Sequence, residues 1–370
     1  MDPVLEVTPG TTGVEPGHIE RIEFRAMGSQ ILAAVESDDV QAAAMLAQVP
    51  AWFEEWEQAL SRFRRDSDLS ILNNTSAPDS PVIVSPLLWE LLRLALEAAA
   101  LTGGLVTPTL LNALEDAGYK RSFQAMSRDG QGREDNGREV TIKIAGPHTD
   151  SLFAAANSPS SSSSSNSSDF IQAPGDWHNI KTYAANRSVA LPLGVRIDLG
   201  GIAKGWAADT AAARLSRYGP ALVDAGGDVA VIGPRRDGSG WLVGVDAPSS
   251  SPGEPGEQTE LLSVDSGGIA TSGTDYRRWR QGDEWRHHII DPRTGKPSAT
   301  GVVSATVVAP TTREAEVAAK VALLLGSEYG LDWLEARPNL AGLLVLENGK
   351  VVRTSRLREY LWSTRYGHGG

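Results

Sequence analysis

Hydrophobic positions along the chain alternate in some stretches and recur with helical spacing in others. Alternation over residues 22–36 predicts a strand that is interrupted at residues 26–29. An aspartate at position 38 or 39 can cap a helix that Pro50 kinks or divides, and its apolar face is formed by Val49, Trp52, Phe53, Trp56 and Leu60. The next predicted helix begins at its N-cap Ser85, which a proline follows, and ends at a Thr-Gly-Gly run.

Short apolar runs separated by turns predict a second set of strands later in the chain. They cover residues 187–191, 195–199, 221–232, 241–246, 261–264 and 301–308. Helices are predicted over residues 314–325 and 328–337, and a hairpin joins 342–346 to 351–354 through Asn348-Gly349. Because strands and helices are mixed irregularly, the pattern favours an α+β fold over a doubly wound parallel sheet.

Composition separates three regions from this folded part. Residues 1–19 and 359–370 are predicted to be a disordered lead-in and a tail. Residues 121–178 are rich in Arg, Asp, Gly and Asn and then in Ser, so they bury too little apolar surface to offset the entropy of ordering them. We predict a mostly disordered insertion there, with one strand at 140–144. The alternative is a linker between two domains, but the motifs continue on both sides, which favours one domain over residues 20–358.

Charge and composition narrow the classes of function. The formal net charge of −12 argues against nucleic acid or an anionic membrane as a partner. No run of 18 apolar residues occurs, and the first twenty residues lack the basic start and apolar core of a signal peptide. With no cysteine, disulfides, thiolate metal sites and lipidation at cysteine are excluded. We therefore expect a cytoplasmic protein without direct membrane insertion.

A glycine-rich corner at residues 198–205, Asp-Leu-Gly-Gly-Ile-Ala-Lys-Gly, is the first candidate for chemistry. It is predicted to join a strand to a helix, so that free backbone amides and Lys204 can bind an anion. It differs from the phosphate loop of nucleoside triphosphatases, because Trp206 stands where that motif requires lysine. A tight packing corner without a ligand is the alternative.

Two further turns can contribute to the same site. Residues 224–228, Asp-Ala-Gly-Gly-Asp, place a double glycine between strand halves, and the alternative here is a β-bulge. Residues 269–273, Ile-Ala-Thr-Ser-Gly, end a strand in two hydroxyls and a glycine. This group can hold phosphate oxygens or form an ordinary turn.

Two clusters bring titratable side chains together. In an extended segment at 287–290, His287 and His288 point to opposite faces, so only one of them can enter a given cleft. A structural histidine is the alternative to a catalytic one. On the predicted helix at 314–325, Glu316 and Lys320 are four residues apart and can pair, which is also what a solvated surface pair looks like.

In this order along the chain, the clusters resemble the ApbE family of FAD:protein FMN transferases. The matching segments are AMGS (26–29), LSRF (60–63), SDLSILN (67–73), TGG (102–104), PT (108–109), DLGGIAKGWAAD (198–209), DAGGD (224–228), IATSG (269–273), HHIIDPRTG (287–295) and the helix from VVAP (307–310) to Leu-Gly (325–326). The resemblance spans about 21–355 apart from the insertion. It implies a mixed sheet-and-helix fold with an FAD cleft between its two halves.

The resemblance also implies a reaction and a set of site residues. FMN would move from FAD to a Ser or Thr hydroxyl of an acceptor flavoprotein, possessed by a membrane-associated redox system, with release of AMP and help from magnesium. By similarity, His288 would be the base and Asp291 would orient it or the metal, which Ala203 and Glu316 would bind. FAD would be held by Met27, Gly28, Ser29, Phe63, Leu105, Val106, Thr107, Lys204, Trp206, Asp209, Gly226, Gly227, Asp228, Thr271, Ser272, Gly273 and Ile289.

The chain departs from the family pattern at two positions. Thr107 stands where members usually carry Asp, and Lys320 replaces the threonine of the usual metal-binding Ala-Asp-x-x-x-Thr run, in which Glu316 replaces the aspartate. An ammonium cannot coordinate a cation that requires oxygen ligands. We therefore predict that Lys320 supplies positive charge near the diphosphate and that magnesium binds weakly or not at all. Two alternative functions follow: a protein that carries FAD without turnover, and a hydrolase that splits FAD into FMN and AMP.

Overall fold

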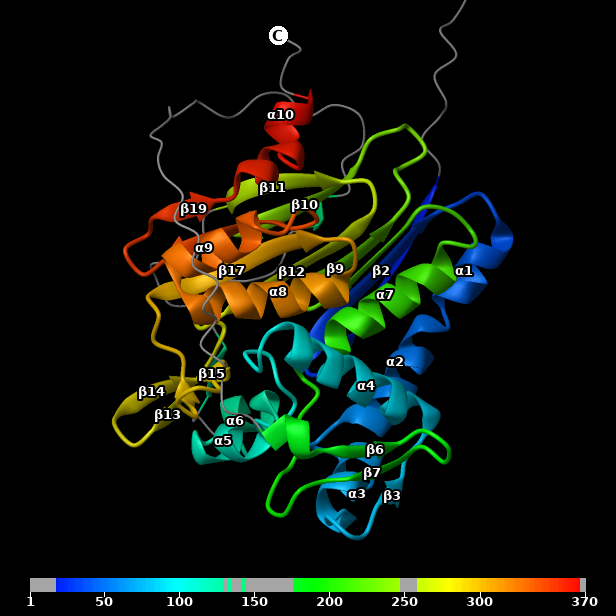
Figure 1. Cartoon of the computed structure of the whole chain (residues 1–370). Helices are drawn as coiled ribbons and strands as arrows, with labels where there is room; N and C mark the ends of the chain where they lie inside the picture. Colours follow the sequence, from blue (N-terminus) through cyan, green and yellow to red (C-terminus); the bar gives the residue numbers. More distant parts are fainter. Residues whose placement is uncertain (1–17, 129–131, 135–141, 144–175, 247–257, 367–370) are drawn as a thin grey trace, which may run out of the picture.

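The computed structural model describes residues 18–128, 132–134, 142–143, 176–246 and 258–366 (Figure 1). Its largest sheet has eight strands in the order β1-β2-β8-β9-β12-β17-β18-β19, and all neighbouring strands are antiparallel. Their bounds are β1 Ile19–Ala26, β2 Ser29–Glu36, β8 Ala221–Ala225, β9 Asp228–Ile232, β12 Gly267–Gly273, β17 Val302–Ala309, β18 Ala341–Leu346 and β19 Val351–Arg353. An antiparallel sheet with helices packed on it confirms the predicted α+β class.

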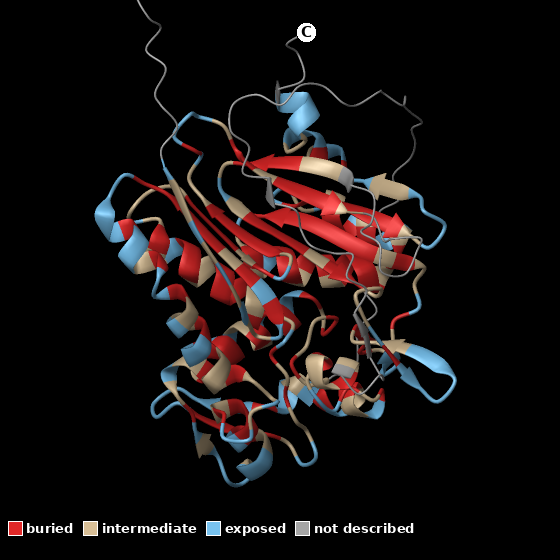
Figure 2. Cartoon of the chain, turned by 180° about the vertical axis from the view of Figure 1, so that it is seen from behind, coloured by how far each residue is buried: buried red, intermediate tan, exposed pale blue. Residues whose placement is uncertain are grey.

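Both faces of this sheet are covered, so its central strands are buried (red in Figure 2). Three helices cover one face: α7 (Ala203–Leu215), α8 (Thr312–Leu325) and α9 (Ser327–Glu335). A small sheet of β10 (Trp241–Asp246), β11 (Gln258–Val264) and β5 (Ile142–Lys143) belongs to the opposite layer, where apolar side chains of β10 and β11 pack against the large sheet. In this layer, α7 and α8 lie between the large sheet and the other half of the molecule.

That other half is mostly helical and lies below α7 and α8 in Figure 1. It contains α2 (Val49–Leu60), α3 (Asp68–Thr75), α4 (Pro86–Leu101), α5 (Leu111–Asp116), α6 (Phe123–Arg128) and the small sheet of β3 (Val82–Ile83), β7 (Ser188–Ala190) and β6 (Lys181–Tyr183), whereas α1 (Val40–Leu46) lies beside α7 and contacts β1 and β2 of the large sheet. A chain of ring contacts from Phe53 through Trp56 to Trp206 joins α2 to α7. This aromatic core fixes the two halves against each other.

Smaller elements flank these two halves. They are a three-stranded sheet of β14 (Glu284–His287), β13 (Arg277–Gln281) and β4 (Gly132–Glu134), the pair β15 (Ile290–Asp291) and β16 (Lys296–Pro297), the 3-10 helices η1 (Asp176–Asn179) and η2 (Ser355–Glu359), and α10 (Trp362–Tyr366). No helix within the described ranges is long and apolar enough to cross a membrane.

Several predicted elements are confirmed with their capping chemistry. The first strand does break at residues 26–29, where Met27 and Gly28 have positive φ. Asp39 caps α1 by accepting from the Gln41 N–H, and Pro50 lies in the first turn of a separate α2. Ser85 caps α4 by accepting from the Leu88 N–H.

Two predicted strands are wrong, for identifiable reasons. Residues 195–199 form no strand, because the side-chain amide of Asn73 takes the place of a neighbouring strand: it bonds both the N–H and the C=O of Ile197, each at 2.8 Å. Residues 221–232 form two antiparallel strands rather than one. Their two-residue turn, Gly226-Gly227, has φ of 71° and 92°, so it is a hairpin and not a bulge.

The predicted domain boundaries fall partly outside the described residues. Of the predicted insertion, α6, β4, β5 and η1 are described, and β5 lies where a strand was predicted. The rest of the insertion, with most of the lead-in and the end of the tail, lies outside the described residues. α10 belongs to the region predicted as a tail.

Candidate active site

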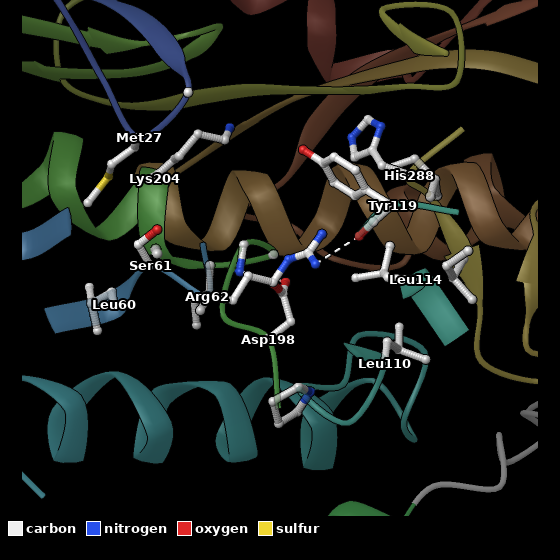
Figure 3. A pocket seen from close by; sticks show the side chains of 18 of the residues that line it. Met27, Leu60, Ser61, Arg62, Leu110, Leu114, Tyr119, Asp198, Lys204 and His288 are labelled. Carbon is white, nitrogen blue, oxygen red and sulfur yellow. Dashed lines mark hydrogen bonds and ion pairs between the residues drawn. The ribbon is translucent and has the colours of Figure 1, made fainter. Parts of the chain in front are cut away.

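A cavity of about 400 Å³ lies between the two halves (Figure 3). A second cavity of about 80 Å³ adjoins it, and the two share Lys204, Arg277 and His288 as lining residues. The three shared side chains come from α7, β13 and the segment between β14 and β15. The cleft is therefore one continuous site with a large and a small compartment.

One wall of the large cavity is apolar and aromatic. Its side chains come from α2, α4, α5, α6 and the loops beside them: Leu60, Phe63, Ala95, Ala98, Leu105, Leu110, Leu114, Tyr119 and Phe123. The rings of Phe63 and Tyr119 meet edge-to-face at 5.7 Å, and Trp279 stacks behind Tyr119 at 5.1 Å. A wall of this kind suits a flat aromatic ligand.

Arg62 crosses this wall with one nitrogen left for a ligand. Its Nε lies 3.0 Å from Asp198 Oδ2, its Nη1 donates to the Tyr119 carbonyl at 2.9 Å, and its guanidinium lies over the Phe63 and Tyr119 rings (Figure 3). Its Nη2 is buried and has no partner among the described residues. A buried donor without a partner is costly unless a ligand satisfies it.

The opposite wall is charged, and it is built where α7, α8 and β9 meet. Lys204 in the first turn of α7 pairs closely with Asp228 at the start of β9 and lies 4.0 Å from Glu316. Lys320 Nζ lies 3.1 Å from Glu316 Oε1, and Glu316 Oε2 accepts from the Gly205 N–H at 3.0 Å. Both carboxylates are only 1% exposed, whereas Lys204 and Lys320 line the cleft. We call these four residues the charge tetrad.

Neighbouring charges favour the ionised forms of Lys204 and Glu316 in the charge tetrad. Burial acts to lower the pKa of Lys204, but the charges of Asp228 and Glu316 outweigh burial and raise it. Burial raises the pKa of Asp228 to about 6, against the opposing charge of Lys204. Burial acts to raise the pKa of Glu316, but Lys320 and Lys204 outweigh it and hold that pKa below its usual value. Two ammonium groups are thus balanced by two carboxylates.

Helices α7 and α8 are in close backbone contact next to the charge tetrad. A Cβ atom added to Gly205 would lie 2.9 Å from both the backbone N and the Cα of Arg313 and 2.9 Å from Glu316 Oε2. Only glycine permits this close crossing.

His288 is the only one of the two neighbouring histidines that lines the cleft, as the alternation predicted. Its Nδ1 is buried without a partner among the described residues. Burial, and then the positive charge of Arg277, lowers the pKa of His288 well below its usual value, so the imidazole is neutral and can accept a proton. His287 instead contacts the Ser298 carbonyl through Nε2 at 3.0 Å.

Asp291 has a different place from the one the resemblance implied. Its carboxylate is held by Arg293, with Nη2–Oδ2 at 2.7 Å and Nε–Oδ1 at 2.9 Å, and Arg293 also donates to the Leu324 carbonyl. The cavity linings do not include Asp291. These contacts make Asp291 part of the turn that carries His288, not a partner of the imidazole.

Most of the remaining predicted residues lie at the cleft. The large cavity is lined by Met27, Gly28, Phe63, Leu105, Val106, Thr107, Ala203 and Ile289, and the small one by Gly226, Gly227, Thr271 and Gly273. Ser29 is buried beside them, and its Oγ accepts from Arg277 at 3.1 Å.

Three predicted residues point away from both cavities. Trp206 follows Lys204 by two residues on α7, about 200° around the helix; its ring packs on Trp56 in the aromatic core, and its Nε1 donates to Glu90. Asp209 caps the start of α8 by accepting from the N–H groups of Thr312 and Arg313. Ser272 faces opposite to Thr271, because side chains alternate along β12.

Four cleft residues were missed as candidate site residues. Arg62 lies in the LSRF motif and Asp198 in the DLGG motif, but only the neighbouring Phe63 and the glycines were considered there. Arg277 follows a Thr-Ser-Gly strand end by four residues, and Tyr119 stood just before the predicted insertion. The sequence showed their presence but not that they point inward.

The residues at the expected metal position do not fit Mg²⁺. Ala203 offers no side-chain oxygen, both Glu316 oxygens already accept hydrogen bonds, and the Lys320 ammonium lies next to Glu316. The aliphatic stem of Lys320 runs along Gly201. Among the described residues, no group of three or more His, Asp or Glu can hold a metal ion. A hard divalent cation needs six or more oxygen ligands, several of them supplied by the protein or its substrate.

The fold and the site together define an α+β protein with one interlobe cleft, aromatic on one wall and charged on the other. The sequence model of the ApbE family matches residues 27–344, and the chain belongs to this family.

Relatives and solved structures agree with this assignment. The FAD:protein FMN transferase of Treponema pallidum is 29% identical over 333 residues, which cover 83% of this chain and 78% of that protein. That of Vibrio cholerae is 36% identical over 143 residues, 38% of this chain and 42% of that protein. The ApbE protein of Thermotoga maritima superposes with a TM-score of 0.71 at 23% identity, covering 93% of this chain and 99% of that one. The flavin transferase ApbE of Vibrio cholerae gives 0.66 at 23% identity, covering 94% and 100%.

Proposed function

We propose that this chain is an FAD:protein FMN transferase, which moves FMN from FAD to a Ser or Thr hydroxyl of an acceptor flavoprotein and releases AMP. Its relatives in Treponema pallidum and Vibrio cholerae carry that name. The observation that carries the proposal is His288 beside Lys204 and Arg277 at the junction of the two cavities, with its Nδ1 unpaired among the residues that the structure describes. The large cavity is within the range of small-molecule sites.

Each wall has a separate task in this reaction. The aromatic wall holds a ring system of FAD, and the Arg62 Nη2 donates to a ring oxygen or nitrogen. The ammonium groups of Lys204 and Lys320, with the Arg277 guanidinium, hold the diphosphate. Positioning and electrostatics of this kind supply most of the catalysis in phosphoryl transfer.

His288 acts on the acceptor. Its imidazole takes the proton of the acceptor hydroxyl while the hydroxyl oxygen bonds to the phosphorus of the FMN moiety. The bond between this phosphorus and the bridging oxygen breaks, and that oxygen leaves with AMP. The departing negative charge is stabilised by the neighbouring cations, and the proton remains on His288 until solvent removes it.

The positive charge that family members obtain from magnesium comes here from Lys320. This proposal is supported by the side chains around Glu316, because they do not offer the oxygen ligands that a hard cation requires: Lys320 lies next to one Glu316 oxygen and the Gly205 N–H donates to the other. Titration with Mn²⁺, followed by electron paramagnetic resonance, should show weak or no binding to the wild type, and Lys320→Thr should tighten it. Tight binding of Mg²⁺ or Mn²⁺ by the wild type, abolished by Glu316→Ala, would contradict this assignment.

We further propose that the acceptor is a flavoprotein domain of a membrane redox system and that the enzyme meets it in the cytoplasm. The support is that the relatives' names specify a protein as acceptor, together with the composition of the chain. A carrier that holds FAD without turnover is the second candidate, favoured by the absence of a fitting metal site from the described residues.

One incubation separates these functions. The protein is mixed with FAD and an acceptor domain that bears a single Ser or Thr flavinylation site, and both proteins are analysed by mass spectrometry. Addition of FMN to the acceptor is the expected result. Free FMN and AMP without addition would indicate hydrolysis, and recovery of intact bound FAD would indicate a carrier.

A further inference from the structure

The small cavity adjoins the charged residues of the cleft, and the family resemblance assigned to FAD four residues that line this cavity alone, namely Gly226, Gly227, Thr271 and Gly273. It is lined by Lys204, Gly226, Gly227, Val245, Asp246, Thr271, Gly273, Tyr276, Arg277 and His288. We propose that it is the acceptor subsite, which receives the hydroxyl-bearing Ser or Thr side chain of the acceptor protein. This inference rests on the proposed transferase function and specifies where its second substrate binds.

The geometry of phosphoryl transfer places the acceptor here. The attacking and leaving oxygens are roughly in line through the phosphorus, so they approach and depart on opposite sides. With FAD in the large cavity, its diphosphate meets the cations at the junction, namely Lys204 and Arg277. The small cavity shares Lys204 and Arg277 with the large one. We therefore infer that the acceptor oxygen approaches the phosphorus from the small cavity, on the side opposite to most of the FAD molecule.

His288 is placed to serve an acceptor in this compartment. It lines both cavities, and its buried Nδ1 has no partner within the described part of the chain. A general base must lie within hydrogen-bond reach of the proton it takes. Because His288 lines the small cavity as well, a hydroxyl bound there lies next to this residue while FAD occupies the large cavity.

The small cavity has room for a short side chain. Its volume of about 80 Å³ is several times the roughly 10–15 Å³ of cavity that one water molecule requires. A hydroxymethyl or hydroxyethyl group can therefore enter it.

Glycines form part of the border of the small cavity. Gly226 and Gly227 form the β8–β9 turn, and Gly273 ends β12. A Cβ at Gly226 would lie 2.5 Å from the Ser29 Cβ, so the packing of this turn against β2 requires glycine there.

Narrowing each cavity in turn tests the assignment. Val245 lines only the small cavity and Leu114 only the large one. Val245→Phe should raise the KM for the acceptor domain at least tenfold and leave the Kd of FAD, measured by flavin fluorescence, within twofold. The matched control Leu114→Phe should do the reverse. Because Val245 also packs in the core, Tyr276→Trp serves as a second variant with the same expected result if Val245→Phe melts early.

The outcomes distinguish the subsite from the reaction. If the narrowed variants bind FAD at least tenfold more weakly, or keep the wild-type KM for the acceptor, the small cavity is not the acceptor subsite, and the transferase proposal stands. If the wild type transfers no FMN to the acceptor, the transferase proposal itself fails. FAD hydrolysis that persists in Val245→Phe while transfer is lost would be the clearest support, because water still fits where a side chain does not.

Discussion

The two walls of the cleft come from different parts of the chain and hold their side chains in different ways. The aromatic wall is built from residues 60–123, whose rings and aliphatic groups pack against one another without fixed directions. The charged wall is built from residues 204–320, and each of its ammonium groups has a carboxylate partner that is almost fully buried. The Arg62–Asp198 ion pair and the hydrogen bonds that Arg277 donates to Gly28 and Ser29 link the early part of the chain to the later one at this cleft.

This difference shows how affinity and turnover are separated. Apolar contacts tolerate small displacements, because burial of surface has no direction. Charged groups that act on a phosphorus atom do not tolerate them, since reaction depends on position to within a fraction of an ångström. We therefore expect changes on the aromatic wall to weaken FAD binding and changes on the charged wall to reduce turnover or folding stability.

The largest expected effect is on the charged wall, from His288→Ala. Loss of a general base should lower kcat for FMN transfer by about 10²- to 10⁴-fold. FAD affinity should stay within about threefold, because the imidazole faces the acceptor. Stopped assays with mass detection measure the rate, and fluorescence titration measures the affinity. A variant with wild-type turnover would remove His288 as the base.

Next in size is Lys204→Met, which leaves Asp228 buried without its partner. At pH 8 we expect the free energy of unfolding to fall by about 3–5 kcal/mol, as measured by urea denaturation. The double variant Lys204→Met/Asp228→Leu should recover most of this loss, because it removes the unpaired charge. FAD binding should stay weak in both variants; full recovery of binding in the double variant would contradict a role of Lys204 toward the diphosphate.

His287, the neighbour of His288, should make the folding stability depend on pH. Burial lowers the pKa of His287 to about 4, so below pH 6.5 the unfolded chain binds a proton that the folded chain does not. Stability due to this residue is therefore present above pH 6.5 and lost as the pH falls toward 4, by about 3 kcal/mol in all. His287→Asn should lose correspondingly less stability over this interval. An identical pH profile of urea unfolding in the two proteins would argue against a neutral, buried His287.

The smallest expected effect is on the aromatic wall. Phe63 is 40% exposed at the cleft and packs edge-to-face on Tyr119. Phe63→Ala should weaken FAD binding by roughly 3- to 10-fold, the value of one aromatic contact, with kcat at saturating FAD unchanged. Phe63→Tyr is the matched control and should bind FAD normally. A fall in kcat larger than the loss of affinity would remove the distinction between the walls.

Sequence patterns predicted the parts of this molecule that local chemistry decides. The caps at Asp39 and Ser85, the break at residues 26–29 and the assignment of one histidine to the cleft follow from neighbouring residues alone. Most of the residues that the motifs singled out line the two cavities. The strand predicted at 195–199 failed, because the side chain of Asn73, far away in the sequence, satisfies its backbone.

Direction of side chains was the information that the sequence lacked. Trp206 and Asp209 share a helix with Lys204, yet they serve the aromatic core and the start of α8. Arg62 and Arg277 were not among the predicted site residues, and the packing of the two halves places both at the cleft. Which face of an element meets a cleft depends on partners distant in the chain, and a single sequence does not specify them.

Gly205 determines the distance between the two cationic side chains of the cleft. Because the backbones of α7 and α8 are in close contact at this glycine, the separation of Lys204 on α7 from Lys320 on α8 depends on how closely the helices cross. A chain of this architecture with alanine or a larger residue at that point must splay the helices, and its two cations would then span a longer substrate segment. Re-engineering such a protein for a different donor nucleotide should accordingly begin at this contact rather than at the lysines.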